Sequence, residues 1–455
     1  MDNNSSSIND DNNLNELETD NIFKLIFKFS IPAVVGMIVN SIYNMVDRMF
    51  IGNYVGEDAL GGLVVAFPIM MFYFAFASVT GVGGAALVSI KFGEKDEDTA
   101  QKVFGNMLMM IAIVCIVGIL AGIFFLDEML YLAGATGNIF EQAKIYFRVL
   151  LFGIPFQLTS FVLSSLLRAE SKPKIAMACM ITAAISNIIF DYIFIVIVGM
   201  GTFGAALATV LGQAIGFCIS AKHFLSGNSK LKLKKENLKL DFGIITQILS
   251  IGSFNFINSV GVSFSSALLN KSLAFYGGDA AITSMGAINS LGTLAIMPLM
   301  GMQQGLQPII GFNHGANKKE RVREAFFKSV GIAFTFTSCV CLLMNMFPEF
   351  AISMFIPEDS PTMPIAVEGF KYYIFMLPML SIYVVAIALF QATGSGKTAL
   401  ILGSTRQFIF LIPLTYIVPK IVNSLTGVWL IIPISDGLAI SLACVLIARK
   451  LMKYK

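Results

Sequence analysis

The stretch VFGNMLMMIAIVCIVGILAGIFFL, residues 103–126, decides the class of this protein, because it carries no charged residue along its whole length. A helix needs about 20 mainly apolar residues to cross a bilayer. Over the whole chain of 455 residues, 56% are hydrophobic and 13% are charged, whereas soluble proteins have about 25% charged residues. A soluble core cannot bury so much apolar surface. The sequence therefore predicts a polytopic membrane protein.

Similar apolar runs on both sides of this stretch predict an all-α fold with twelve membrane-spanning helices. One long polar stretch, SGNSKLKLKKENLKLD at 226–241, separates the first six runs from the last six. We expect a disordered acidic tail (1–20), a first lobe (21–225), a basic cytoplasmic linker (226–242) and a second lobe (243–455). The predicted spans are 27–54, 60–90, 103–126, 141–167, 174–198, 203–225, 243–275, 280–311, 326–347, 366–391, 398–418 and 427–448.

An internal repeat relates the two halves. The loop KFGEKDEDTAQKVF (91–104) matches NHGANKKERVREAFF (313–327), and the turn glycine Gly56 matches Gly277. Each half holds six predicted spans, so both halves enter the membrane in the same direction. Parallel repeats of this kind are related by an axis along the membrane normal, with a substrate path between them. The repeat predicts two six-helix lobes with pseudo-two-fold symmetry.

The positive charges predict the orientation. When twelve spans are drawn, most of the 31 Lys and Arg residues fall on the side that also holds both termini. Cytoplasmic loops carry such an excess of Lys and Arg. The first residues, MDNNSSSINDDNNLNELETD, lack the basic start and apolar core of a signal peptide. We expect a multi-pass protein of the cell membrane, with both termini in the cytoplasm.

Several other classes are not favoured. The net charge of +3 forms no basic face, so we expect no nucleic-acid partner. The run GSGKT (394–398) ends like a phosphate-binding loop, but Gln391 occupies the position of the first glycine, so we expect no ATP site. The six cysteines lie in apolar runs without CxxC spacing, and the chain has two histidines. We therefore expect no disulfide, no Cys/His metal site and no cofactor other than a coupling ion.

Ionisable side chains within spans are costly and usually functional. Asp47 lies nine residues before the turn glycine Gly56, and Asp191 lies eight residues before the next turn on the same side. Both therefore lie about 12–14 Å below one surface. Thr209 reaches that depth on the returning helix, and Asn187 is one helical turn before Asp191. Carboxylate, amide and hydroxyl oxygens at one depth could hold a proton or a small hard cation, so these side chains are also the predicted metal ligands if the ion is Na⁺.

The repeat makes this acidic chemistry specific to one lobe. The counterparts of Asp47 and Asp191 are Leu268 and Leu414. A purely architectural role would not predict that asymmetry. The alternative for Asp47 is a residue at a hydrated helix end beside Arg48. Because burial disfavours an ionised carboxylate and a neighbouring cation favours it, Asp191 is the better candidate for a proton carrier.

Other polar residues within the spans are weaker candidates. Asp436, in the run PISDG of the last span, has no partner that the sequence identifies. We expect Asp436, Gln303, Gln304 and Pro32 to contribute to substrate binding or gating. Arg406 lies near the start of its span, and we expect its side chain to extend toward the membrane surface.

These residues resemble the multidrug and toxic compound extrusion (MATE) family. The resemblance rests on Pro32 lying fifteen residues before Asp47, and it covers the chain from residue 21 onward. It rests also on the runs VDRMFIGNYVGEDAL (46–60), NIIFDYIF (187–194) and RQFIFLIPL (406–414).

The resemblance implies a function. Family members with a first-lobe site use an aspartate of span one, an Asn-x-x-x-Asp of span five and a threonine of span six, which correspond to Asp47, Asn187, Asp191 and Thr209. It implies a monomeric secondary antiporter that exports small amphipathic, cationic compounds in exchange for H⁺ or Na⁺. Other members carry a glutamate in span seven, which this sequence lacks, so we do not expect coupling through the second lobe.

The mechanism expected from these residues is alternating access. Neutralising a carboxylate at mid-membrane removes a cost of about 3 kcal/mol, enough to bend span one and release the cargo. A lipid-linked saccharide flippase is an alternative, but it would need a cationic cavity for its pyrophosphate. Spans 60–90 and 280–311 contain no Lys or Arg before their cytoplasmic ends, which does not favour such a cavity. An enzyme is not expected, because neither histidine lies within a span core.

Overall fold

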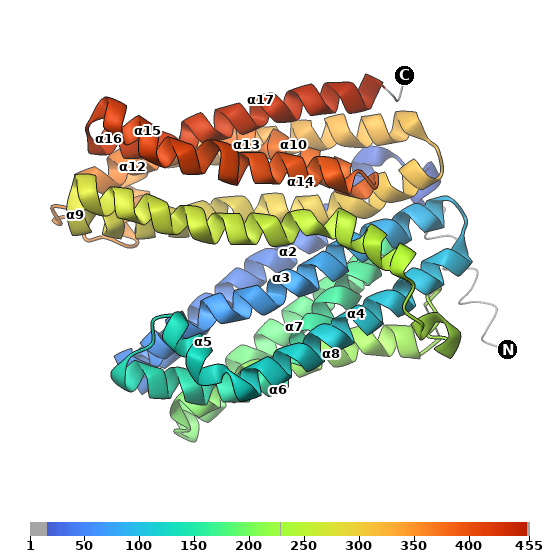
Figure 1. Cartoon of the computed structure of the whole chain (residues 1–455), viewed down its shortest axis with the longest axis horizontal. Helices are drawn as coiled ribbons and strands as arrows, with labels where there is room; N and C mark the ends of the chain where they lie inside the picture. Colours follow the sequence, from blue (N-terminus) through green and yellow to red (C-terminus); the bar gives the residue numbers. More distant parts are fainter. Residues whose placement is uncertain (1–15, 228, 453–455) are drawn as a thin grey trace.

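The computed structural model describes residues 16–227 and 229–452, whose helices form two bundles (Figure 1). The first lobe comprises α2 (Ile22–Phe50), the π-helical η1 (Ile51–Val55), α3 (Glu57–Gly93), α4 (Glu97–Phe124), α5 (Leu126–Leu132), α6 (Gly137–Ala169), α7 (Pro173–Asp191), the π-helical η2 (Tyr192–Ile197) and α8 (Gly201–Leu225). A short 3₁₀ helix, η3 (Lys235–Leu238), lies in the linker.

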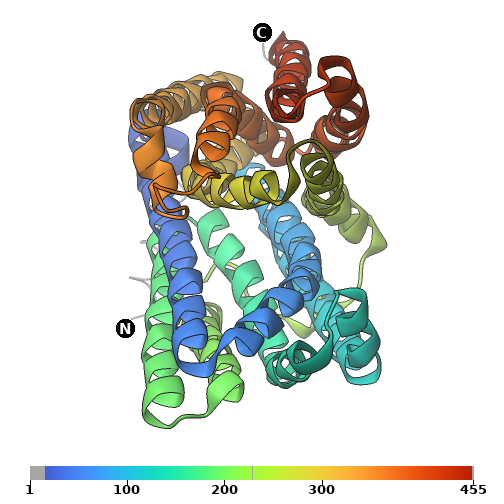
Figure 2. The same ribbon diagram turned by 90° about the vertical axis from the view of Figure 1, so that its left-hand side faces the viewer.

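The second lobe follows the linker. It comprises α9 (Phe242–Gly315), α10 (Lys319–Met346), α11 (Pro348–Ser353), α12 (Met363–Phe375), α13 (Leu377–Ala392), α14 (Gly396–Ser404), the π-helical η4 (Thr405–Leu411), α15 (Ile412–Val422), α16 (Leu425–Trp429) and α17 (Ile431–Met452). Seen along the helices, first-lobe and second-lobe helices form separate groups (Figure 2).

The helices account for the predicted spans. In the described chain ten helices are long and apolar enough to cross a membrane, and the pair α12 and α13, which meet at 44°, makes an eleventh. The helix α9 is counted once there, although its 74 residues would extend about 110 Å, far beyond a hydrocarbon core of about 30 Å. Its backbone is non-helical at Gly278, so α9 supplies two spans and the total is twelve. The predicted all-α, two-lobe membrane fold is confirmed.

The helix ends extend beyond the predicted apolar runs. The helix α10 begins at Lys319, whereas hydropathy placed the start of that span at 326. Its first two turns, KERVREAF, are polar on one side, and an apolar window does not mark such turns. The helix α2 begins at Ile22 because the Asn21 side chain accepts a hydrogen bond from the Phe23 amide at 2.8 Å, which caps the helix.

The predicted disordered tail is wrong for its last residues. Residues 16–19 form a helical turn, and the Leu17 side chain is fully buried. Leu17, an apolar residue in an otherwise acidic segment, was the feature of the sequence that could have indicated this ordered turn. Residues 1–15 lie outside the described residues.

The internal repeat is visible in backbone geometry. Lys95 and Asn317, which are 222 residues apart, both have left-handed backbones, with φ of 59° and 58°. The structural counterpart of the turn glycine Gly56 is Gly278, whose φ is 61°, rather than Gly277 as the sequence match suggested. Glycine adopts a positive φ more readily than any other residue does.

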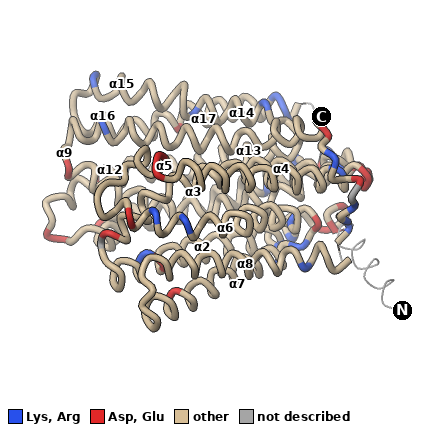
Figure 3. The backbone as a smooth tube through the Cα atoms, turned by 60° about the horizontal axis from the view of Figure 1, so that its bottom comes forward, with Lys and Arg blue, Asp and Glu red and all other residues tan. Residues whose placement is uncertain are grey.

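The two lobes meet most closely at the end where both chain termini lie, and they diverge toward the opposite end (Figure 1). We call these the terminal end and the far end. A Cβ atom on Gly93 of α3 would lie 2.0 Å from the Phe312 carbonyl oxygen, and one on its counterpart Gly315 of α9 would lie 2.0 Å from the Ile90 carbonyl oxygen. This reciprocal backbone contact requires glycine on both sides. Many of the Lys and Arg residues gather at the terminal end (Figure 3).

Candidate functional site

The candidate site is built on three helices of the first lobe, α2, α7 and α8. Gly212 of α8 lies against α7, where an added Cβ would be 2.8 Å from the Ala183 carbonyl oxygen. This close approach brings Thr209 beside Asn187, whose side-chain Nδ2 donates to Thr209 Oγ1 at 3.4 Å. Two of the four predicted residues are therefore in direct contact.

The two predicted acids are also brought together. Asp47 of α2 is 6% exposed, and Asp191 at the end of α7 is fully buried. Their carboxyl groups are within hydrogen-bonding reach of each other when one of them carries a proton. Asp191 directly precedes the π-helical η2, and such wider turns are frequent at functional sites.

Oxygen atoms without donors converge at this pair. Asp47 Oδ1, both carboxylate oxygens of Asp191 and Asn187 Oδ1 are buried and accept no hydrogen bond. Each such acceptor costs about 1–3 kcal/mol when it stays unsatisfied, and two adjacent carboxylates repel each other. A proton or a hard cation removes both penalties, because oxygen ligands suit small cations. The residues present therefore fit an ion of this kind.

The described residues hold no group of three or more His, Cys, Asp or Glu side chains that could bind a metal ion. Any cation at this site would have to be held by two carboxylates together with amide and hydroxyl oxygens. That ligand set fits H⁺ or Na⁺ better than a transition metal, which prefers nitrogen or sulfur.

Two tyrosines that the sequence did not single out lie beside the acids. Tyr43 is one helical turn before Asp47 on α2, and Tyr146 of α6 is buried within hydrogen-bonding reach of Thr209. The spacing of Tyr43 from Asp47 was a usable signal, whereas Tyr146 lies on a helix whose rotation the sequence does not show. Arg48 is exposed, with its guanidinium 5.6 Å from the centre of the Phe67 ring.

The expectation for Arg406 is wrong. Its side chain turns inward and forms an ion pair with the buried Asp436 of α17, in which Nε and Nη2 donate to Asp436 Oδ1 at 2.8 and 2.7 Å. Its guanidinium also lies 5.8 Å from the centre of the Tyr383 ring. Opposite charges inside two consecutive spans were the missed signal, because an unpaired buried charge is far more costly than a paired one.

The remaining candidates lie apart from the acid pair. Gln303 Nε2 and Gln307 Nε2 both donate to Gln391 Oε1 of α13, at 3.3 and 3.0 Å, within the second lobe. Gln304 is half-buried on the same helix. Pro32 is buried in α2, which stays helical from Ile22 to Phe50. Roles for these residues in gating stay predictions.

Comparison with known proteins identifies the family. The family model MatE matches residues 32–193 and 256–417, once in each lobe. The multidrug export protein MepA of Staphylococcus haemolyticus is 26% identical over 418 residues, covering 92% of this chain and 91% of the relative. MepA of Staphylococcus aureus is 26% identical over 439 residues, covering 96% of both chains.

Solved structures share the fold. An outward-facing multidrug resistance MATE family transporter of the MOP superfamily superposes with a TM-score of 0.90 at 24% identity, covering 96% of this chain and 98% of that one. A MATE structure in the bent conformation gives a TM-score of 0.91 at 24% identity, covering 97% and 98%. Because the family model covers most of the chain in two copies, this protein belongs to the MatE family and is a membrane transporter rather than an enzyme.

Proposed function

We propose that the protein is a secondary-active multidrug exporter that exchanges small amphipathic organic cations for H⁺ or Na⁺. The relatives are multidrug export proteins, which supports the cargo class. The observation that carries the coupling is the group of four buried oxygen acceptors without donors on Asp47, Asn187 and Asp191. A positive species or a shared proton stabilises such a group, because it satisfies the acceptors and offsets the repulsion between the carboxylates.

Ion binding in the first lobe can change the contact between the two lobes. When a proton or Na⁺ enters, it neutralises the repulsion between Asp47 and Asp191. Because α2 carries Asp47 and also packs along α9 of the other lobe, where Gly301 and Gly305 contact the backbone of Val34 and Ser30, a shift of α2 changes the contact between the lobes. A ligand can shift a conformational equilibrium only by its differential affinity for the two states, and the neutralised charges supply that difference.

Aromatic residues between the lobes suit an organic cation. Phe256 of α9 lies against Phe72 and Phe76 of α3, with ring centres 6.2 and 5.1 Å apart. Aromatic faces attract cations and pack against planar apolar groups. A lipid-linked saccharide flippase would instead require cationic groups for a pyrophosphate, so we keep the exporter as the single proposal.

The proposed location is the cell membrane, with the terminal end in the cytoplasm. The gathering of Lys and Arg at the terminal end (Figure 3) supports this orientation, because cytoplasmic loops carry excess positive charge. The lobes diverge at the far end (Figure 1), which would then face outward. We propose that one chain is sufficient, since the path lies between its own two lobes, and that ATP and nucleic acid take no part.

Transport in reconstituted liposomes tests this function. The purified protein would be inserted into vesicles, a proton gradient or a sodium gradient would be imposed separately, and a fluorescent organic cation would be followed. We expect the cation to move against one of the two ion gradients and to stop when that gradient is dissipated. If neither gradient moves the cation, and ATP or no energy source does, ion-coupled export is wrong.

A further inference from the structure

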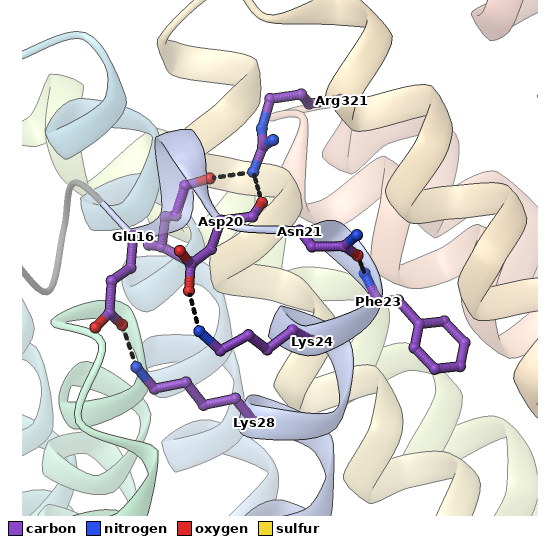
Figure 4. Close-up of polar contacts among 8 residues, drawn as sticks. Glu16, Asp20, Asn21, Phe23, Lys24, Lys28 and Arg321 are labelled. Atoms are coloured by element: carbon purple, nitrogen blue, oxygen red, sulfur yellow. Dashed lines mark hydrogen bonds and ion pairs between the residues drawn. The ribbon is translucent and has the colours of Figure 1, made fainter.

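A short segment before the first span crosses from one lobe to the other. Residues 16–20, here called the N-terminal strap, precede α2 of the first lobe but lie against the second lobe (Figure 4). Leu17 of the strap is fully buried. Its carbonyl oxygen accepts hydrogen bonds from Asn313 Nδ2 at 3.0 Å and from Arg321 Nη2 at 3.1 Å. Both donors belong to the second lobe.

Two further contacts hold the strap on the second lobe. Arg321 Nη2 donates to the Asp20 carbonyl oxygen at 2.7 Å. A hydrogen bond within the second lobe, from Arg321 Nε to Asn313 Oδ1 at 2.9 Å, orients this guanidinium. Lys318 forms an ion pair with Glu18 at 2.9 Å, and its hydrogen bond holds the pKa of the Glu18 carboxyl below its usual value. Hydrogen bonds from charged groups to backbone carbonyls are among the stronger ones in proteins.

The strap also forms ion pairs with the first lobe. Glu16 forms an ion pair with Lys28 of α2, and Asp20 forms one with Lys24 at 3.0 Å. These contacts run alongside the start of α2 (Figure 4). The strap, taken as a whole, thus has contacts with both lobes at the terminal end.

The second lobe repeats the arrangement. The linker that precedes α9 lies on the first lobe at α4, where Asn106 Nδ2 donates to the Lys239 carbonyl oxygen at 3.4 Å and Asn106 Oδ1 accepts from the Asp241 amide at 2.8 Å. A Cβ atom on Gly105 would lie 2.0 Å from the Asn237 carbonyl oxygen. In both repeats, the segment before the first span is bound by the third span of the opposite lobe.

The linker must cross between lobes because it joins them, whereas the N-terminal strap has no such necessity. Ordering a backbone costs about 1–2 kcal/mol per residue. The strap offsets part of this cost through its contacts with Asn313, Lys318 and Arg321, which exist only while the two lobes are close. From this geometry we infer that the N-terminal strap is a latch. It stabilises the state in which the terminal end is closed, and it detaches when the lobes separate there. The inference rests on the alternating access of the proposed function.

A distance measurement tests the latch. Spin labels would be placed at Lys102→Cys on α4 and Glu324→Cys on α10, which are exposed, repeat-equivalent positions at the terminal end, after replacement of the six native cysteines. The distance distribution would be recorded in detergent without cargo or ion gradient. We expect Leu17→Ser, and a chain lacking residues 1–20, to raise the ratio of long to short distances roughly five- to tenfold.

Charge-matched variants separate the latch from local effects. Arg321→Gln should produce the same shift, whereas Arg323→Gln, which removes an exposed cation from the same helix, should leave the distribution unchanged. The inference of a latch is wrong if Leu17→Ser and the shortened chain both keep the distance distribution of the parent protein. It is also wrong if Arg321→Gln is the one variant that shifts the distribution. Because no transport is involved, a failure of ion-coupled export would appear only in the vesicle assay.

Discussion

At the scale of single residues, the arrangement of the acid pair lowers the stability of the protein, which a function in ion binding would explain. The oxygens of Asp47 and Asp191 are buried without donors, an arrangement that a protein selected only for stability would replace. Sites that bind ions or transition states often keep such unfavourable groups. This cost is present in the empty site, and the proposed coupling ion would remove it.

Asp191→Asn should therefore make the empty protein more stable. The amide can donate a hydrogen bond to Asp47 and removes one of two repelling charges, so we expect the midpoint of thermal unfolding in detergent to rise by about 2 °C. The matched control is Asp58→Asn, an exposed carboxylate bonded to Asn138 at 3.3 Å, which should change the midpoint little. A lower midpoint for Asp191→Asn would mean that its carboxylate already has a favourable partner.

For the Arg406–Asp436 pair we expect the opposite effect on stability, because removing its carboxylate should destabilise the protein. Asp436→Ala leaves the partly buried Arg406 guanidinium without its partner, and we expect it to destabilise the protein by about 2–3 kcal/mol. The double variant Arg406→Leu with Asp436→Leu should recover most of that loss, because no buried charge remains. Thermal unfolding of the single and double variants checks this. A double variant that is less stable than Asp436→Ala contradicts a mainly structural pair.

The sequence predicted the acid pair better than the ion pair for a physical reason. Depth below a surface follows from counting residues along a helix, and this placed Asp47 and Asp191 at one level. Whether two side chains meet depends also on helix rotation, which a sequence without strong amphipathic faces does not show. Arg406, Asp436 and Tyr146 lie on such helices, so their partners became visible only in the structure.

At the scale of elements, apolar runs predicted the existence of the spans, while their ends and irregularities required the structure. The π-helical turns η1, η2 and η4 cannot be recognised from hydropathy, because a π-helical turn contains the same apolar residues that an α-helical turn would. The polar first turns of α10 were missed for the complementary reason: they are helical but lie outside the apolar window. The break in α9 was predicted correctly as a turn.

The turn in α9 allows a prediction about substitutions of its glycine. Gly278 has φ of 61° and open space around an added Cβ atom, whereas Gly286 has ordinary helical geometry and equally open space. Gly278→Ala should destabilise the protein by about 1–3 kcal/mol, because φ of 61° with ψ of −158° is a backbone conformation that essentially only glycine adopts. Gly286→Ala should be neutral or stabilising by up to about 1 kcal/mol. Equal effects of the two substitutions on thermal unfolding would show that the turn tolerates a side chain.

At the scale of the whole molecule, the internal repeat predicted two lobes, but only the structure shows which end is closed. The reciprocal contacts of Gly93 with Phe312 and of Gly315 with Ile90 join the backbones at the terminal end. A sequence carries no information on which of two rocking states is the more stable when they differ by a few kcal/mol.

Gly93→Ala should oppose closure of the terminal end. Its Cβ would overlap a backbone oxygen at 2.0 Å, so the lobes must move apart there. With the spin labels at positions 102 and 324, we expect the longer distance to dominate. Gly331→Ala on α10, where nothing lies within 4 Å of the added carbon, should reproduce the parent distances. An unchanged distribution in Gly93→Ala would mean that local adjustment absorbs the overlap.

The proposed coupling of an ion gradient to export through the acid pair is tested by Asp191→Asn in liposomes. Gradient-driven transport of a fluorescent cation would be compared in the parent, Asp191→Asn, Asp47→Asn and the control Asp58→Asn. We predict that both site variants lose ion-driven transport by about a hundredfold or more while remaining folded, and that the control keeps the parent rate. Transport by Asp191→Asn at the parent rate under the same gradient would contradict the claim.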